Sequence, residues 1–178
     1  APGIEAHTHD YIKTGQLDSK FGFGMENGHA FMAVENALSI KGLKLMGFHC
    51  HIGSQIFEDE PFKDAAEIMI QFAKTVNERY GFRTKEIDFG GGFGIRYTEK
   101  DKPLAVKNYI EVLVESVKKA CEKYDVPIPK ILIEPGRAIV GEAGTTLYTI
   151  GSIKNIPGVR KYVSVDGGMS DNIRPALY

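Results

Sequence analysis

Apolar residues in the middle of the chain alternate between short continuous runs and stretches with a helical period. Residues 44–50 (KLMGFHC) form a short apolar run before a Gly-Ser pair, which predicts a β-strand leading into a loop. A helical spacing follows and stops at Gly81, where a C-terminal cap is expected. The residues at this spacing are Phe62, Ala65, Ala66, Met69, Phe72, Val76 and Tyr80.

The same order of strand and helix then recurs. Residues 86–89 predict a second strand that runs into consecutive glycines, and residues 130–133 (KILI) predict a third. Between them lies a second helical face, formed by Tyr109, Leu113, Val117, Ala120 and Tyr124. Strands that alternate with helices of this length predict βαβ units, and therefore an α/β fold with a parallel sheet or barrel.

The rhythm changes after about residue 145. Residues 145–153 and 160–165 predict two strands joined by the turn sequence Asn-Ile-Pro-Gly, which is the spacing of a β-hairpin. We therefore expect two domains, residues 1–144 with the βα units and residues 145–178 with the start of an antiparallel β region. Three βα units cannot close an eight-stranded barrel, so we expect the chain to be an internal piece of a longer protein.

Composition and charge narrow the class of protein. With 43% hydrophobic and 25% charged residues, and no apolar run long enough for a membrane span, the chain is typical of soluble globular proteins. The net charge of −1 gives no electrostatic footprint for nucleic acid or an anionic membrane. We expect no secretory signal from residues 1–5, and the two cysteines, Cys50 and Cys121, fit a reducing cytoplasm.

The unusual residues fall at the carboxyl ends of the three expected parallel strands. His49 and His51 follow the first strand, residues 90–94 the second, and residues 134–137 the third. Ligands of barrels and of open α/β sheets bind at this edge. Three such motifs in register predict a ligand site there.

The second motif, DFGGGFG over residues 88–94, has four glycines in five positions. Glycine allows backbone N–H groups to approach a ligand closely, which suits a phosphate. The run matches neither the dinucleotide fingerprint nor a P-loop, since Ile95 and Arg96 stand where those motifs continue. A tight turn without a ligand remains the alternative.

In the third motif, EPGR, Pro135 and Gly136 predict a turn directly after a buried strand. Glu134 and Arg137 on either side form a local ion pair or bind a ligand. In the second case Arg137 supplies donors to a phosphate or carboxylate, and Glu134 faces a cationic nitrogen.

The first motif, GFHCHIGS, suggests a metal pair because His49 and His51 occupy alternate positions of a strand. Zinc or iron needs further ligands, and the later strands offer glycines and an arginine instead. Asp88 precedes its glycine turn and need not point the same way. Ordinary packing of the histidines is a further alternative. A phosphate-binding loop on the next strand favours an imidazole stacked on a cofactor ring.

The other histidines do not complete a metal site in this interpretation. His7, His9 and His29 fall in an N-terminal stretch that we expect to be loop-like. We therefore predict no metal.

The motifs HIGSQ, DFGGGFG, EPGR and DNIRPALY, in this order and spacing, resemble the barrel-type (fold type III) pyridoxal-phosphate decarboxylases, and among them the diaminopimelate decarboxylases. The segment TGQLDSKFG near the N-terminus is also similar to this family. The resemblance implies that residues 1–144 are the later part of a TIM (β/α)8 barrel that binds pyridoxal 5'-phosphate. Residues 145–178 then begin the C-terminal β domain.

For the cofactor's phosphate, the resemblance implies contacts from the side chain of Ser54 and the backbone of Gly91 and Gly92. Gly136 and Arg137 belong to the same cofactor-binding set.

For the ring and the substrate, the resemblance implies that His51 stacks on the pyridine and that Glu134 pairs with its nitrogen. Arg137, Arg174 and Tyr178 hold carboxyl groups of the substrate. A further arginine suits a substrate with a carboxylate at both ends, whereas a surface arginine is the alternative from the residue alone.

The implied reaction is decarboxylation of meso-diaminopimelate to L-lysine and CO2 in the cytoplasm, by a homodimer with a shared active site. The family's Schiff-base lysine and proton-donating cysteine are expected outside this segment, so no residue in it is assigned as catalytic. We assign Lys20 no such role. The alternatives are a related ornithine, arginine or carboxynorspermidine decarboxylase, a non-catalytic homologue, and a metal hydrolase that uses His49 and His51.

Overall fold

The computed structural model describes residues 1–4 and 21–173. The chain divides into two compact units, Ala1–Glu142 and Ala143–Tyr178, and each is described by itself. The helices of the first unit are α1 (His29–Ser39), α2 (Glu60–Tyr80), α3 (Val106–Tyr124) and α4 (Gly136–Val140). Its strands are β1 (Gly47–His49), β2 (Glu86–Asp88) and β3 (Lys130–Leu132). The second unit contains β4 (Ile150–Ile156) and β5 (Arg160–Val165).

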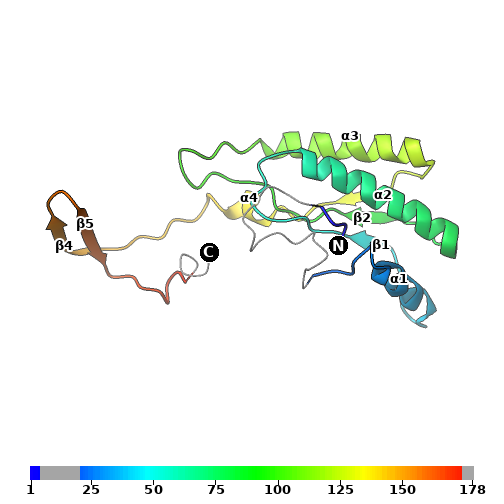
Figure 1. Ribbon diagram of the computed structural model, residues 1–178, viewed down its shortest axis with the longest axis horizontal. Helices are drawn as coiled ribbons and strands as arrows, with labels where there is room; N and C mark the ends of the chain where they lie inside the picture. The colour runs from blue at the N-terminus through cyan, green and yellow to red at the C-terminus, as the bar shows by residue number, and fades with distance from the viewer. Residues whose placement is uncertain (5–20, 174–178) are drawn as a thin grey trace. The chain divides into compact units, whose positions relative to one another are not determined.

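The three strands of the first unit form a parallel sheet in the order β1-β2-β3. Long helices α2 and α3 run along one face of this sheet (Figure 1). Each helix connects two neighbouring parallel strands, as a βαβ crossover requires. The α/β class expected from the sequence is therefore confirmed.

Helix α2 follows directly from its sequence. Pro61 stands in the first turn, where the missing N–H costs no hydrogen bond, and Glu60 complements the positive end of the helix. The helix ends at Gly81, as predicted, whose φ of 66° is left-handed and whose N–H donates to the carbonyl of Asn77. Its apolar stripe faces the sheet and α3.

The main hydrophobic core lies between the sheet and these two helices. Ile87 of β2 and the α3 residues Tyr109, Leu113 and Val117 have no exposed surface. Tyr109 keeps its hydroxyl satisfied by donating to the carbonyl of Ile56, 3.0 Å away. Burial of each such apolar side chain stabilises the fold by about 1.5–3 kcal/mol. The helical periods read from the sequence are thus confirmed as the core.

Helix α1 was not predicted. His29 is its first residue rather than part of a loop, so that expectation is wrong. Gly28 precedes it with a φ of 78°, and Val34 packs with Phe72 and Val76 of α2 in a second, smaller apolar cluster. A helix with so short a buried stripe gives only a weak periodic signal.

The strands and the turn after β3 also differ in detail. Each parallel strand has three residues, fewer than predicted, and β1 begins only at Gly47. β3 is partly exposed rather than buried. After it, Pro135 leads into the short helix α4 instead of a simple turn.

The second unit is a two-stranded antiparallel hairpin. Gly158 takes a left-handed φ of 73° in its turn, and Val159 donates its N–H to the carbonyl of Ile156. The predicted hairpin is confirmed, but β4 begins at Ile150 and not at residue 145. Several apolar side chains of this hairpin are exposed: Ile150, Ile153, Tyr162, Val163 and Val165.

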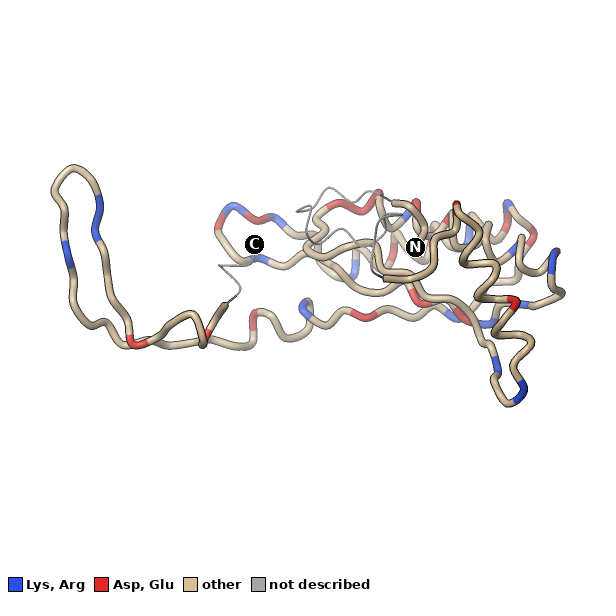
Figure 2. The backbone as a smooth tube through the Cα atoms, turned by 60° about the horizontal axis from the view of Figure 1, so that its bottom comes forward, with Lys and Arg blue, Asp and Glu red and all other residues tan. Residues whose placement is uncertain are grey.

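Charged residues of both signs are interspersed along the backbone (Figure 2). Several of them pair across helical turns, for example Lys74 with Glu78 and Lys107 with Glu111. Such exposed pairs contribute little stability. Among the helices within the described ranges, none is long and apolar enough to cross a lipid bilayer.

Candidate functional site

The loops that follow β1, β2 and β3 are joined by backbone hydrogen bonds. Cys50 donates to the carbonyl of Asp88 at 2.9 Å, and Glu134 donates to the carbonyl of Gly90 at 2.7 Å. Further out, Ile56 donates to the carbonyl of Gly92 at 2.9 Å. The three motifs predicted to meet at one sheet edge therefore do meet there. We call these segments, residues 50–56, 89–95 and 133–137, the strand-end loops.

The glycine run is necessary because the strand-end loops approach one another so closely. A Cβ on Gly91 would lie 2.1 Å from the carbonyl oxygen of Glu134, and one on Gly92 would lie 2.2 Å from that of Gly53. Gly92 also has a left-handed φ of 86°. The tight-turn explanation thus accounts for part of the motif, and the same turn leaves the peptide backbone at the surface of a cavity.

His51 is fixed against the glycine run. Its Nδ1 accepts the N–H of Gly91 at 3.3 Å, so the proton of the neutral ring lies on Nε2. Burial lowers the pKa of His51 and the neighbouring His49 lowers it further, whereas Glu134 and Asp88 raise it. The neutral form of the ring is therefore favoured. A neutral imidazole is better suited than an imidazolium cation to stack against an aromatic ring.

A cavity of about 190 Å³ collects most of the predicted cofactor-binding residues. Its wall includes His51, Ser54, Gly92, Glu134, Gly136 and Arg137. Gly91 is not on this wall but carries the N–H that holds His51. Typical small-molecule pockets measure about 300–1,000 Å³, so this cavity is smaller than most of them.

The hydrogen-bond donors and acceptors around this cavity suit a ligand with an anionic group at one end and a protonated nitrogen at the other. The guanidinium of Arg137 and the hydroxyl of Ser54 are donors to an anion, whereas the carboxylate of Glu134 accepts from a protonated nitrogen. The imidazole of His51 offers an aromatic face. Pyridoxal phosphate, with its phosphate, ring and pyridine nitrogen, fits this set of groups.

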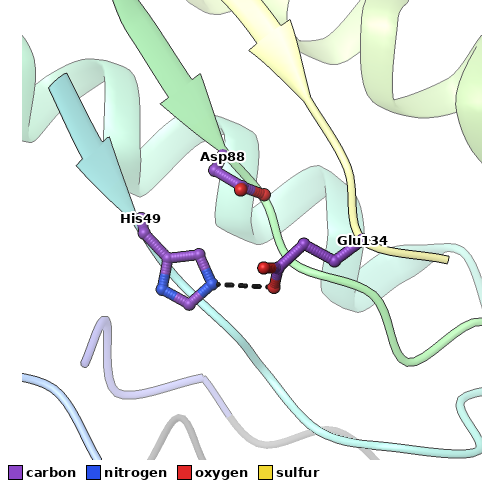
Figure 3. Close-up of side chains that lie close together, drawn as sticks. All are labelled: His49, Asp88 and Glu134. Carbon is purple, nitrogen blue, oxygen red and sulfur yellow. Dashed lines mark hydrogen bonds and ion pairs between the residues drawn. The ribbon is translucent and has the colours of Figure 1, made fainter. Parts of the chain in front are cut away.

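His49, Asp88 and Glu134 meet on the face of the sheet that α2 and α3 do not cover (Figure 3). His49 and Asp88 are register partners, and Glu134 lies two residues after Leu132, the partner of Asp88 on β3. The Nε2 of His49 lies 3.1 Å from Oε2 of Glu134. One ligand atom of each residue lies within 4.8 Å of the others.

This arrangement corrects one step of the sequence interpretation. We expected His49 to lack further metal ligands and did not count Asp88 among them, but both carboxylates lie beside the imidazole. An imidazole with two carboxylates offers three donors to a divalent metal. The two carboxylates can equally accept hydrogen bonds from a protonated nitrogen. The same three side chains therefore suit either a metal ion or a protonated ligand nitrogen.

Gln55 is a functional candidate that the sequence interpretation did not single out, although it ends the motif HIGSQ. Its amide accepts the N–H of Ile95 at 3.2 Å and donates to the carbonyl of the same residue at 2.6 Å. Its oxygen also accepts from Arg137 at 3.4 Å. Gln55 adopts a left-handed φ of 61°, which is uncommon for a side chain of this type. It therefore joins all three strand-end loops.

The cysteines are not placed for chemistry. Both are buried, and burial raises the pKa of Cys50 to about 12 and that of Cys121 above its ordinary value. The thiolate is the reactive form and the metal ligand, so neither residue is a candidate nucleophile or ligand. Arg174, Tyr178 and Lys20 lie outside the described residues.

A larger hollow of about 310 Å³ lies between α1, α2 and β1. Its wall is mainly apolar, with Val34, Phe48 and Phe72, and His49 also lines it. It lacks the convergence of donors and acceptors that marks a specific ligand site. The smaller cavity among the strand-end loops is therefore the better candidate.

A family model described as "Pyridoxal-dependent decarboxylase, pyridoxal binding domain" matches residues 1–141. The chain is also 56% identical over 177 residues to the diaminopimelate decarboxylase of Bacillus subtilis. That alignment covers 99% of this chain and 40% of the relative. The chain thus spans well under half the length of this curated relative.

Solved structures give the same picture. The diaminopimelate decarboxylase of M. jannaschii matches with a TM-score of 0.86 and 34% identity, over 99% of this chain and 40% of the other. The enzyme from Helicobacter pylori, crystallised with L-lysine, matches with a TM-score of 0.84 and 32% identity, over 99% and 41%.

Proposed function

Because the chain belongs to the pyridoxal-dependent decarboxylases, as the match of its first 141 residues to their pyridoxal-binding domain establishes, we propose that the strand-end loops bind pyridoxal 5'-phosphate. The observation that carries this proposal is the cavity that collects His51, Ser54, Glu134 and Arg137 from three separate strand ends. His51 and Ser54 are far from Glu134 and Arg137 in the sequence, so only the fold brings them to one cavity.

Each end of the cofactor has its own residues in this proposal. Ser54, the backbone of Gly91 and Gly92, and the neighbouring Gly136 and Arg137 bind the phosphate. These groups neutralise its charge with N–H and O–H donors.

The ring lies against His51, whose neutral imidazole is held flat by the N–H of Gly91. Glu134 accepts a hydrogen bond from the protonated pyridine nitrogen and stabilises its positive charge. The bound cofactor supplies the electron sink that decarboxylation of an amino acid needs. The chain's own contribution is to bind this group, orient it and set its charge.

The substrate proposed is meso-diaminopimelate, with L-lysine and CO2 as products. The relatives named above carry this activity in their names, and the motif DNIRPALY of this chain resembles the same enzymes. Arg137 binds one carboxylate of the substrate, and Arg174 and Tyr178 bind the other, which a substrate with a single carboxylate, such as ornithine, lacks.

The proposal extends to the whole protein. The first 144 residues form the later part of a TIM (β/α)8 barrel, in which the face bearing His49 and Asp88 is the barrel interior, and residues 145–178 begin a β domain. We propose a cytoplasmic homodimer with a shared active site, whose Schiff-base lysine and proton-donating cysteine lie outside this segment.

The test is a decarboxylation assay on a full-length protein that carries this chain, with pyridoxal phosphate present. We expect CO2 and L-lysine from meso-diaminopimelate, and much slower release of CO2 from L-ornithine or L-arginine. Equal rates with ornithine would show a related decarboxylase instead. Cofactor binding without turnover of any of these substrates would indicate a non-catalytic homologue.

A further inference from the structure

His49 is a chemically distinctive residue that the proposed function does not yet use. It lies at the end of β1, its side chain is about half exposed (53%), and its Nε2 lies 3.1 Å from Oε2 of Glu134 (Figure 3). The two residues are 85 positions apart in sequence. Their contact is therefore created by the parallel register of the sheet and not by a local turn.

The backbone and the side chain of Glu134 are held by different partners. Its N–H donates to the carbonyl of Gly90, and its own carbonyl faces Gly91 at a distance that excludes any side chain there. The carboxylate itself is 57% exposed, and a glutamate side chain loses considerable rotamer freedom when it is fixed. The imidazole of His49 supplies that restraint.

The direction of the hydrogen bond follows from the chemistry of the partners. An ionised carboxylate only accepts, so Nε2 of His49 must carry the proton and donate. Oε2 of Glu134 is thereby engaged, and Oε1 is left to accept from another N–H group. A carboxylate held in this way is prepared for a protonated ring nitrogen before that nitrogen arrives.

Asp88 explains why such a restraint is useful. One of its oxygens lies in the same 4.8 Å group, and its Oδ1 accepts the N–H of Gly90 at 2.9 Å. Two carboxylates this close repel each other, and the repulsion favours orientations of Glu134 that turn away. In the part of the chain that the structure describes, Asp88 from β2, Glu134 after β3 and His51, two residues along its own chain, lie beside His49. Ala1, which carries the N-terminal amino group, lines the same hollow as His49.

We propose that His49 is a positioning residue, whose Nε2–H holds the Glu134 carboxylate in the orientation that binds the ring nitrogen of the cofactor. This inference rests on the proposed function, because it gives Glu134 that partner. It predicts that the donor at position 49 controls the charge state of the bound cofactor, and not merely the stability of the fold.

The experiment uses the full-length holoenzyme with three substitutions. His49→Leu removes the N–H and keeps an apolar side chain, whereas His49→Gln retains an N–H donor. His29→Leu, at the exposed start of α1, is the matched histidine control. For each protein, we would measure the dissociation constant of pyridoxal phosphate, the absorbance of the bound cofactor against pH, kcat and KM for meso-diaminopimelate, and the melting temperature.

We expect His49→Leu to weaken cofactor binding and lower kcat by about 10- to 100-fold, the range found when a residue that orients a ligating side chain is removed. The midpoint of the absorbance change should move to lower pH by about one unit, since a misplaced carboxylate stabilises the protonated ring nitrogen less. KM should change by less than about threefold, because the substrate contacts are intact. His49→Gln should restore most of each value, and His29→Leu should match the unsubstituted protein.

Three outcomes would overturn the inference. His49→Leu could leave the absorbance profile and cofactor affinity unchanged, or His49→Gln could behave like His49→Leu despite a normal melting temperature. Alternatively, stoichiometric zinc could be found that is lost in His49→Leu, which would make the trio a metal site. If the unsubstituted protein itself bound no pyridoxal phosphate, the proposed function would fail instead, so the two failures are distinguishable.

Discussion

The hydrophobic core and the strand-end loops are both built on strands β1, β2 and β3, but they use different kinds of residue. The core lies between the sheet and helices α2 and α3. In the core, Ile87, Leu113 and Val117 are completely buried and carry no polar groups. In the strand-end loops, His51, Glu134 and Arg137 surround a cavity and form specific polar contacts. The difference indicates that burial alone fixes the scaffold, whereas the loops depend on the exact approach of backbone and polar atoms.

This division predicts which substitutions alter stability and which alter ligand binding. Because side chains alternate between the two faces of a strand, Phe48 and Ile87 pack towards the helices while their neighbours His49 and Asp88 face the other way. A change on one face should therefore have little effect on the property that the other face controls.

The largest effect is expected for Leu113→Ala in the core. Leu113 has no exposed surface, and truncation of a buried leucine lowers the free energy of unfolding by about 2–5 kcal/mol. Denaturant unfolding of the full-length protein would measure this, with the exposed Glu115→Ala as control. The fraction that stays folded should bind pyridoxal phosphate normally. A loss of affinity in folded protein would show that the core and the loops are not separable.

Gly91→Ala should have the next largest effect, which we expect on the binding of pyridoxal phosphate. The new Cβ would lie 2.1 Å from the carbonyl oxygen of Glu134, which the backbone can relieve only by separating two strand-end loops. Overpacking of this kind costs about 1–3 kcal/mol, and if this cost falls on the cofactor-binding conformation, affinity for pyridoxal phosphate should fall by about 5- to 150-fold. Gly144→Ala is the control, because a Cβ there meets nothing within 4 Å. Equal affinities of the two variants would contradict this account of the glycine run.

His51→Ala removes the proposed stacking surface without disturbing the core. A stacked aromatic pair contributes about 0.5–1.5 kcal/mol, so cofactor affinity should fall by about 2- to 12-fold, with slower decarboxylation. Equilibrium titration with pyridoxal phosphate and a CO2-release assay would measure both. Metal content should be the same before and after the substitution. Unchanged affinity and activity would count against the stacking role.

The smallest expected effect is a pH dependence of stability that originates from His51. Burial lowers its pKa in the folded chain, so between that value and the ordinary value of about 6.5 the unfolded chain binds more protons. The contribution of the neutral ring is complete above about pH 6.5 and is lost as the pH falls towards the lowered folded pKa. Unfolding of the cofactor-free protein between neutral and mildly acidic pH would reveal it. His51→Ala should flatten this dependence, and an equally steep profile would assign it to other groups.

Sequence patterns predicted the parts of the fold that depend on long apolar periods. Helices α2 and α3, the cap at Gly81 and the hairpin each have a strong local signal, and each is confirmed. Helix α1 was missed because its buried stripe is short. The first residue of β4 was misplaced because residues 145–149 have a strand-like composition but precede the first ladder pair, Ile150 with Val165. Thr149 forms hydrogen bonds with Asp166, just beyond that pair.

The chemistry of the strand-end loops was predictable only in outline. Motif order and spacing indicated that three loops would meet, because parallel strands share one carboxyl edge. The partnership of His49 with Glu134 depends on the exact register of three strands, and the bridging role of Gln55 depends on a left-handed backbone that its residue type does not suggest. Neither the His49–Glu134 contact nor the backbone conformation of Gln55 can be predicted from the order of residues along the chain.

The most direct test is a crystal structure of the full-length protein with pyridoxal phosphate bound. We expect the phosphate at Ser54, Gly91 and Gly92, the ring against His51, and the pyridine nitrogen at the Glu134 carboxylate. A metal ion held by His49, Asp88 and Glu134, with the cofactor bound elsewhere or not at all, would contradict it.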